Sequence, residues 1–168
     1  EIDPTSVNLK ESTLLMYQVQ SRYDDYAADS SVPHDRETES WYLIGKGRLD
    51  EAQKVLEDWA AQQPQHPILP AKQALLLASR GDFHAAEAKI PVILKQHPFK
   101  DPLYHHVTYD IACIYAMEGK SAEAVKWLKE SAASGFHLYP RYIKDSFLDH
   151  IRKSPEFIQF LSEMKTEN

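Results

Sequence analysis

Three glycines, each followed five residues later by an alanine, constrain the fold of this sequence more than any other feature. The glycines are 34 and 38 residues apart, and the pairs are Gly47 with Ala52, Gly81 with Ala86, and Gly119 with Ala124. Glycine ends a helix readily because it adopts the left-handed conformation without a Cβ penalty. An alanine just after the turn lets the second helix approach the first closely. The pattern therefore predicts three helical hairpins.

Other recurring positions support the same hairpins. Pro64 and Pro98 each follow a glycine by seventeen residues, where proline closes a second helix because the residue before it is pushed out of the α region. Aliphatic side chains recur nine residues after each glycine and small side chains seven before it: Leu56, Ile90 and Leu128, and Ser40, Ala74 and Ala112. A hairpin that cannot bury its apolar face alone must stack on a neighbour. We therefore expect an all-α chain of stacked hairpins.

These positions resemble the tetratricopeptide repeat (TPR), whose period is 34 residues and whose small residues and proline match those above. The resemblance implies a right-handed helical-hairpin solenoid of about three repeats, at 33–66, 67–100 and 105–138, with residues 101–104 as an insertion. The Trp and Leu usual early in the first helix are missing. Pro91 lies inside the second helix of the middle repeat and is expected to kink it near Glu87.

Both ends of the chain are expected to add helices to this single domain of residues 1–168. Residues 8–27 carry an apolar stripe and predict an N-terminal helix, and residues 28–35 read as a loop. In the C-terminal part, 139–168, we expect two short helices, the second with Ser154 as its N-cap. This tail, with "FLDHIRKSPEF", is similar to the ending of many bacterial TPR proteins and is expected to cap the solenoid.

Composition excludes several classes of protein. The 168 residues are 43% hydrophobic and 26% charged, as in a globular domain, and the net charge of −6 includes no concentrated Lys and Arg stretch. We therefore expect no nucleic-acid partner, and no apolar run is long enough to predict a membrane span. The single Cys113 fits a reducing compartment, so a cytoplasmic location is expected. The chain begins with Glu1 and not with methionine, so it can be a segment of a longer protein.

The family resemblance also implies a concave surface formed by the first helix of each repeat. Its positions fall thirteen, ten, six and three residues before each turn glycine. The candidate groove residues for a protein or peptide partner are His34, Glu37, Trp41, Ile44, Leu75, His106 and Tyr109. These positions contain no Lys, Arg or Asn, which disfavours the binding of a terminal carboxylate seen in chaperone-binding members. The groove is expected either to bind an external segment or to be filled by the N-terminal helix.

No pattern in the sequence predicts catalysis, a cofactor or a metal. The adjacent His105 and His106 point about 100° apart on a helix, and no metal-ligand spacing accompanies them. Cys113 is interpreted as a buried, inert cysteine, and the short "GKG" at 45–47 does not form a phosphate-binding loop. An enzyme would become a serious alternative if a cleft joined His105 or His106 to convergent carboxylates.

We therefore expect a non-catalytic protein–protein interaction module, a scaffold or adaptor, which can also form a homodimer. The alternative is the regulatory TPR portion of a larger signalling enzyme or transcription regulator. The residues that precede Glu1 in the complete gene product would separate the two.

Overall fold

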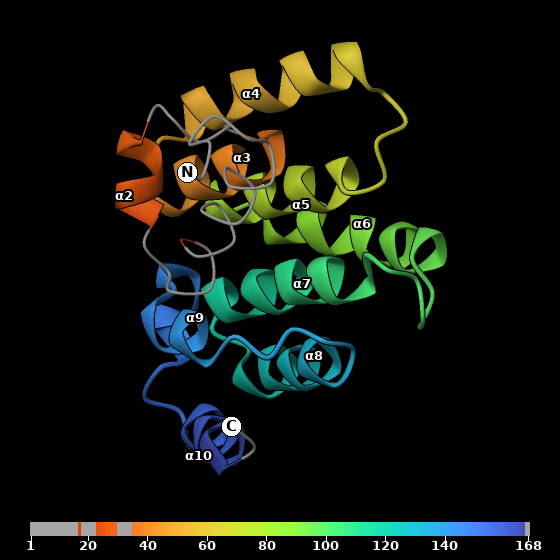
Figure 1. The fold of residues 1–168 in the computed structure, drawn as a ribbon. Coiled ribbons are helices and arrows are strands. Elements are labelled where there is room, and N and C mark those ends of the chain that lie inside the picture. The colour runs from red at the N-terminus through yellow and green to blue at the C-terminus, as the bar shows by residue number, and fades with distance from the viewer. Residues whose placement is uncertain (1–16, 18–22, 30–34, 167–168) are drawn as a thin grey trace, which may run out of the picture.

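The computed structural model describes residue 17 and residues 23–29 and 35–166, and every regular element within them is helical (Figure 1). These elements are α2 (Tyr23–Ala28), α3 (Arg36–Gly45), α4 (Leu49–Gln62), α5 (Leu69–Ser79), α6 (Phe83–Gln96), α7 (Tyr104–Glu118), α8 (Ser121–Ala133), α9 (Tyr139–Lys144), the 3-10 helix η1 (Ser146–Ile151) and α10 (Pro155–Thr166). The all-α prediction is confirmed for the described part of the chain.

The helices between α3 and α8 form three sequential pairs. α3 packs against α4, α5 against α6, and α7 against α8, and neighbouring pairs touch through α3–α5, α4–α5, α5–α7 and α6–α7 contacts. Figure 1 shows the pairs following one another from orange at the top to teal below. α3 with α4 and α5 with α6 lie within the segments 33–66 and 67–100, whereas α7 begins at Tyr104, one residue before the segment 105–138.

The turn inside each pair has the same geometry. Gly47, Gly81 and Gly119 have φ angles of 71°, 84° and 82°, the left-handed region that favours glycine. In the first turn the amide of Arg48 donates to the carbonyl of Leu43 over 2.9 Å, and equivalent bonds close the other two turns. These bonds satisfy carbonyls that the end of a helix leaves unpaired. The predicted role of the three glycines is confirmed.

The small side chains that were expected at the contact between paired helices are buried. The six recurring alanine and serine positions are all completely buried: Ser40, Ala52, Ala74, Ala86, Ala112 and Ala124. A larger side chain at any of these positions would force the backbones apart, because helix interiors are packed without spare volume.

Prolines follow the ends of α4 and α6, and one proline lies inside α6. α4 ends at Gln62 and α6 ends at Gln96, each two residues before the proline that was expected to close it. Pro91 lies inside α6, which is a single helix from Phe83 to Gln96.

The C-terminal segment contains one more element than the sequence predicts. α9 is followed by η1 and then α10, and the amide of Phe157 donates to the Ser154 hydroxyl over 3.2 Å, which confirms the predicted N-cap. η1 packs on α7, while α10 packs on α8 and α9. The residues that anchor this segment are fully buried: Tyr142, Leu148, Ile151, Phe157 and Phe160. The tail thus covers one side of the last helical pair.

Only part of the predicted N-terminal helix can be compared. Of residues 8–27, Tyr17 and the α2 residues 23–27 are described and helical, and the remainder lies outside the described residues. Asp35, at the end of the predicted loop, accepts a hydrogen bond from the amide of Thr38 over 2.8 Å and so caps α3.

Candidate ligand pocket on the inner helices

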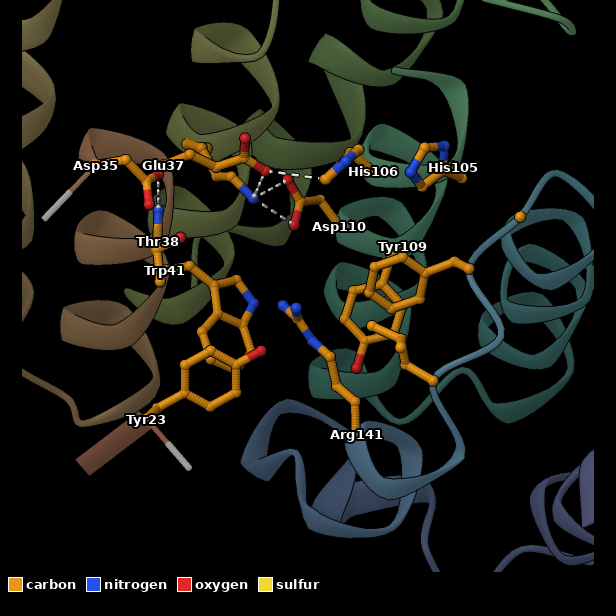
Figure 2. A pocket seen from close by; sticks show the side chains of 14 residues that line it. Tyr23, Asp35, Glu37, Thr38, Trp41, His105, His106, Tyr109, Asp110 and Arg141 are labelled. Atoms are coloured by element: carbon orange, nitrogen blue, oxygen red, sulfur yellow. Dashed lines mark hydrogen bonds and ion pairs between the residues drawn. The ribbon is translucent and has the colours of Figure 1, made fainter. Parts of the chain in front are cut away.

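A pocket of about 450 Å³ opens between α3, α7, α9 and the segment that joins α8 to α9. Figure 2 shows its side chains pointing into one space from opposite sides. The lining combines aromatic and charged groups: Tyr23, Asp35, Glu37, Thr38, Trp41, Lys72, His105, His106, Tyr109, Asp110, Gly135, Phe136, Leu138 and Arg141.

One side of the pocket is an ionic cluster centred on Lys72, whose side chain is 3% exposed. Its Nζ lies 2.8 Å from Oδ2 of Asp110 and 3.4 Å from Oε1 of Glu37. The same Glu37 oxygen lies 3.1 Å from Nδ1 of His106. Because these residues come from α3, α5 and α7, the cluster joins one helix of each pair (Figure 2).

The charges and hydrogen bonds within this cluster shift the pKa values of its residues. Burial favours the neutral form of Glu37, but the charge of Lys72 and the hydrogen bond from His106 outweigh it and hold the pKa of Glu37 well below its ordinary value. Burial likewise disfavours the Lys72 cation, yet Asp110 and Glu37 keep the pKa of Lys72 above its ordinary value. Burial, and then the charge of His106, lower the pKa of His105. Lys72 and Glu37 are therefore ionised at neutral pH.

The other side of the pocket is a guanidinium surrounded by aromatic rings. The Cζ atom of Arg141 lies 4.1 Å from the ring centroid of Trp41 and 4.8 Å from that of Tyr109. The rings of Phe136 and Tyr23 follow at 5.2 and 5.4 Å. Cation–π attraction to several faces stabilises a guanidinium that is largely removed from water. The Arg141 side chain is 12% exposed.

Arg141 remains charged in this setting. Burial alone would lower its pKa, but the neighbouring Tyr23, Tyr109 and Asp145 outweigh burial and raise the pKa of Arg141 above its ordinary value. Asp145 lies at the base of the cage, where it accepts hydrogen bonds from the Tyr109 hydroxyl at 2.6 Å and the Phe147 amide at 2.9 Å. Its Oδ2 is 3.8 Å from Nε of Arg141, too far for a hydrogen bond.

The indole of Trp41 and the guanidinium of Arg141 have hydrogen-bond donors that lack an acceptor within the described residues. Nε of Arg141 and Nε1 of Trp41 are buried without a hydrogen-bond partner there. The terminal nitrogens of Arg141 likewise make no hydrogen bond to any residue that the structure describes. Figure 2 shows the indole nitrogen of Trp41 and the guanidinium turned toward the same space. Unpaired buried donors cost free energy unless water or a ligand supplies an acceptor.

The structure brings four of the predicted groove residues together: Glu37, Trp41, His106 and Tyr109 all line the pocket. Ile44 and Leu75 do not line it and are buried in the core. His34 lies outside the described residues.

Sequence reasoning missed Lys72, Asp110 and Arg141. Lys72 and Asp110 interrupt otherwise apolar helices, "LPAKQALLLAS" and "VTYDIACIYA", and that interruption was the available signal. Arg141 comes from the C-terminal segment, which the repeat pattern does not place beside the inner helices. The predicted groove positions contain no Lys or Arg, whereas the pocket contains both.

A cleft that joins a histidine to convergent carboxylates would favour an enzyme, and this pocket brings His106 together with Glu37 and Asp110. However, both carboxylates are ion-paired with the Lys72 ammonium, which holds them in place. Cys113 is completely buried, and burial raises the pKa of its thiol well above the ordinary value, so it is not a reactive nucleophile. Within the described residues no three His, Cys, Asp or Glu side chains are grouped as metal ligands would be.

No family model matches the chain, and comparison with curated proteins and with solved structures gives no significant match. In the part of the chain that the structure describes, none of the helices has the length and apolar character needed to cross a membrane.

Proposed function

We propose that the chain is a non-catalytic protein–protein interaction module built as a right-handed solenoid of three TPR-like hairpins. In this proposal α3, α5 and α7 are the first helices of the repeats, and the segment 139–168 is the C-terminal cap. The shared turn geometry, the buried small residues and the contacts between successive first helices support it. The binding surface is the concave side formed by α3, α7 and α9.

The observation that carries the proposal is the lining of the pocket on this side. Trp41 and Tyr109 line the pocket beside charged groups, a mixture found at the energetic centres of protein interfaces, with 7% and 1% of their surface exposed. Glu37 and His106 at the mouth are 27% and 36% exposed and are accessible to an approaching segment. A peptide or protein segment can insert a side chain into the pocket between these rings and reach the polar groups at its mouth with its backbone.

A site-specific photo-crosslinking experiment tests this function. A benzophenone amino acid replaces His106 at the mouth of the pocket, and a matched variant carries it at Lys126, an exposed position on α8. We expect His106 to crosslink a defined set of proteins in a lysate of the native cell. We also expect Trp41→Ala to weaken their capture, with Trp127→Ala as its control. Identical adducts from both positions, or capture unaffected by Trp41→Ala, would contradict the proposal.

The regulatory portion of a larger signalling enzyme or transcription regulator is compatible with the same surface, since the partner would then be a domain of the same polypeptide. A homodimer would use the same kind of contact. Light scattering on purified protein distinguishes the dimer, because it reports the mass in solution directly.

A further inference from the structure

The guanidinium of Arg141 and the indole N–H of Trp41 are hydrogen-bond donors that can bind a ligand in the pocket. Hydrogen bonds to charged donors are among the stronger polar contacts, and a guanidinium presents them in a planar fork. Nearby carboxylates do not supply the acceptor: Asp145 is occupied by Tyr109 and Phe147, while Glu37 and Asp110 contact Lys72. Within the described residues the fork therefore faces an open space.

The charges around that space select the ligand. Lys72 contacts two carboxylates directly, whereas the carboxylate beside Arg141, that of Asp145, lies 3.8 Å away and accepts hydrogen bonds from Tyr109 and Phe147, so Arg141 keeps donors for a ligand. The carboxylates of Asp35, Glu37 and Asp110 line the pocket and that of Asp145 lies beside it, so a second negative charge on the ligand would be repelled. A monoanion with two oxygens in one plane therefore fits the guanidinium better than a phosphate dianion does.

The dimensions of the pocket favour a small molecule. Its volume of about 450 Å³ falls within the range of roughly 300–1,000 Å³ that is typical of small-molecule sites. The rings of Tyr23, Trp41, Tyr109 and Phe136 supply apolar walls beside the cation. These walls would take the hydrocarbon part of a ligand whose polar end reaches Arg141.

We propose that the pocket binds a small organic monocarboxylate, whose carboxylate accepts hydrogen bonds from the guanidinium of Arg141 and the indole N–H of Trp41. This site lies in the pocket at the floor of the proposed protein-binding surface, and binding of a small acid there does not require a protein partner. A bound acid would satisfy the unpaired donors and change the floor of the concave surface.

The test uses acetate and benzoate as probes, with acetamide and benzamide as neutral analogues of the same shapes. The chain contains three tryptophans, so a ¹H–¹⁵N spectrum shows three indole resonances, and Trp41→Phe identifies that of Trp41. We expect benzoate to shift this resonance saturably and to bind more tightly than acetate, because the aromatic walls bury its ring. The amides should bind at least about tenfold more weakly, because they lack the charge.

Variants then locate the carboxylate. Arg141→Lys keeps the charge but removes the planar fork, and Trp41→Phe keeps a ring but removes the donor. Each is expected to weaken benzoate binding by about tenfold in a ligand-observed titration. Arg80→Lys and Trp127→Phe are the matched controls, since Arg80 pairs with Asp50 on the surface and Trp127 lies on α8. Both controls should bind benzoate as the unchanged protein does.

Several outcomes would overturn the assignment. They are the absence of a shift at Trp41 with either acid, equal binding of acids and amides, tighter binding of inorganic phosphate than of benzoate, and unchanged affinity in folded Trp41→Phe protein. A pocket that takes a peptide terminus but neither free acid would likewise exclude a small-molecule site. Loss of photo-crosslinking at His106 would leave this result standing, so the two proposals fail independently.

Discussion

Lys72 shows at the scale of a single residue why a buried charge is kept in this chain. It extends from α5 to Glu37 on α3 and Asp110 on α7, so one ammonium group connects helices from all three pairs. Removing such a cation leaves carboxylates buried without compensation, which costs far more than the ion pair itself contributes. The residue is therefore a strong determinant of stability as well as part of the pocket.

We expect Lys72→Met to lower the free energy of unfolding by about 3–5 kcal/mol, because Asp110 then loses its counter-charge. Urea denaturation followed by circular dichroism measures the change. Adding Asp110→Asn to Lys72→Met should recover part of the loss, while Lys95→Met, at an exposed position of α6, should change the free energy little. A Lys72→Met protein as stable as the unchanged chain would show that the cluster does not hold the helices together.

Glu37 is expected to make stability depend on pH. Its folded-state pKa lies below its ordinary value of 4.5, so the stabilisation from its carboxylate is fully present above pH 4.5 and is lost as the pH falls toward the folded-state pKa. Glu37→Gln lacks this contribution. The difference in unfolding free energy between the two proteins should therefore be largest near neutral pH and shrink in acid.

Denaturation curves at several pH values test this sign. The control is Glu156→Gln, an exposed residue on α10, which should leave the free energy at neutral pH nearly unchanged. A difference between Glu37→Gln and the unchanged chain that grows on acidification would mean that Lys72 and His106 do not stabilise the carboxylate.

At the scale of the helix, the turn glycines and the buried small residues do different work. The glycines set the backbone conformation, since a Cβ at Gly47, Gly81 or Gly119 would meet no atom within 4 Å. Any cost of substitution there comes from the positive φ angle and not from a clash. The small residues, in contrast, set how closely two helices approach. Both features must hold for a hairpin to close.

A matched pair of substitutions in one turn separates these effects. We expect Gly47→Ala to lower the unfolding free energy by about 1–2 kcal/mol, because a non-glycine residue is strained at a φ of 71°. Gly45→Ala, two residues earlier in α3, should be neutral or raise it by up to about 1 kcal/mol. A Cβ there would make ordinary contact at 3.6 Å with the ring of Phe147. Thermal and urea unfolding of both variants provide the comparison, and equal effects would refute the backbone explanation.

At the scale of the whole molecule, the C-terminal segment closes both the core and the pocket. Its aromatic residues cover α7 and α8, and Arg141 extends from it between Trp41 and Tyr109. Ser146 also donates from its hydroxyl to the carbonyl of Gly45 over 3.3 Å, which joins residues 101 positions apart. The segment thus links the end of the chain to its first helical pair.

Deletion of residues 139–168 should expose the apolar surface of α7 and α8 and cause association. Light scattering coupled to gel filtration measures the mass in solution, which we expect to rise with protein concentration. Ile158→Ser, which changes an exposed apolar residue of α10, is the control and should leave the mass unchanged. A truncated protein that stays monomeric would contradict the capping role.

The sequence by itself determined the helices, their pairing and their turns, because these depend on local features. A glycine at a positive φ, an alanine at a close contact and a proline after a helix act within a few residues, and the spacing of 34 makes them recognisable. The same register selected Glu37, Trp41, His106 and Tyr109, four residues that line one pocket.

Only the tertiary structure decided what lies between those residues. Lys72 reaches carboxylates 35 and 38 positions away, and Arg141 meets Trp41 across 100 residues, so neither contact leaves a trace in local periodicity. A charge at an apolar helix position could be read as an interruption, but its partner depends on how the helices stack. Long-range electrostatics in a desolvated pocket is set by three-dimensional proximity, and the repeat pattern alone does not encode it.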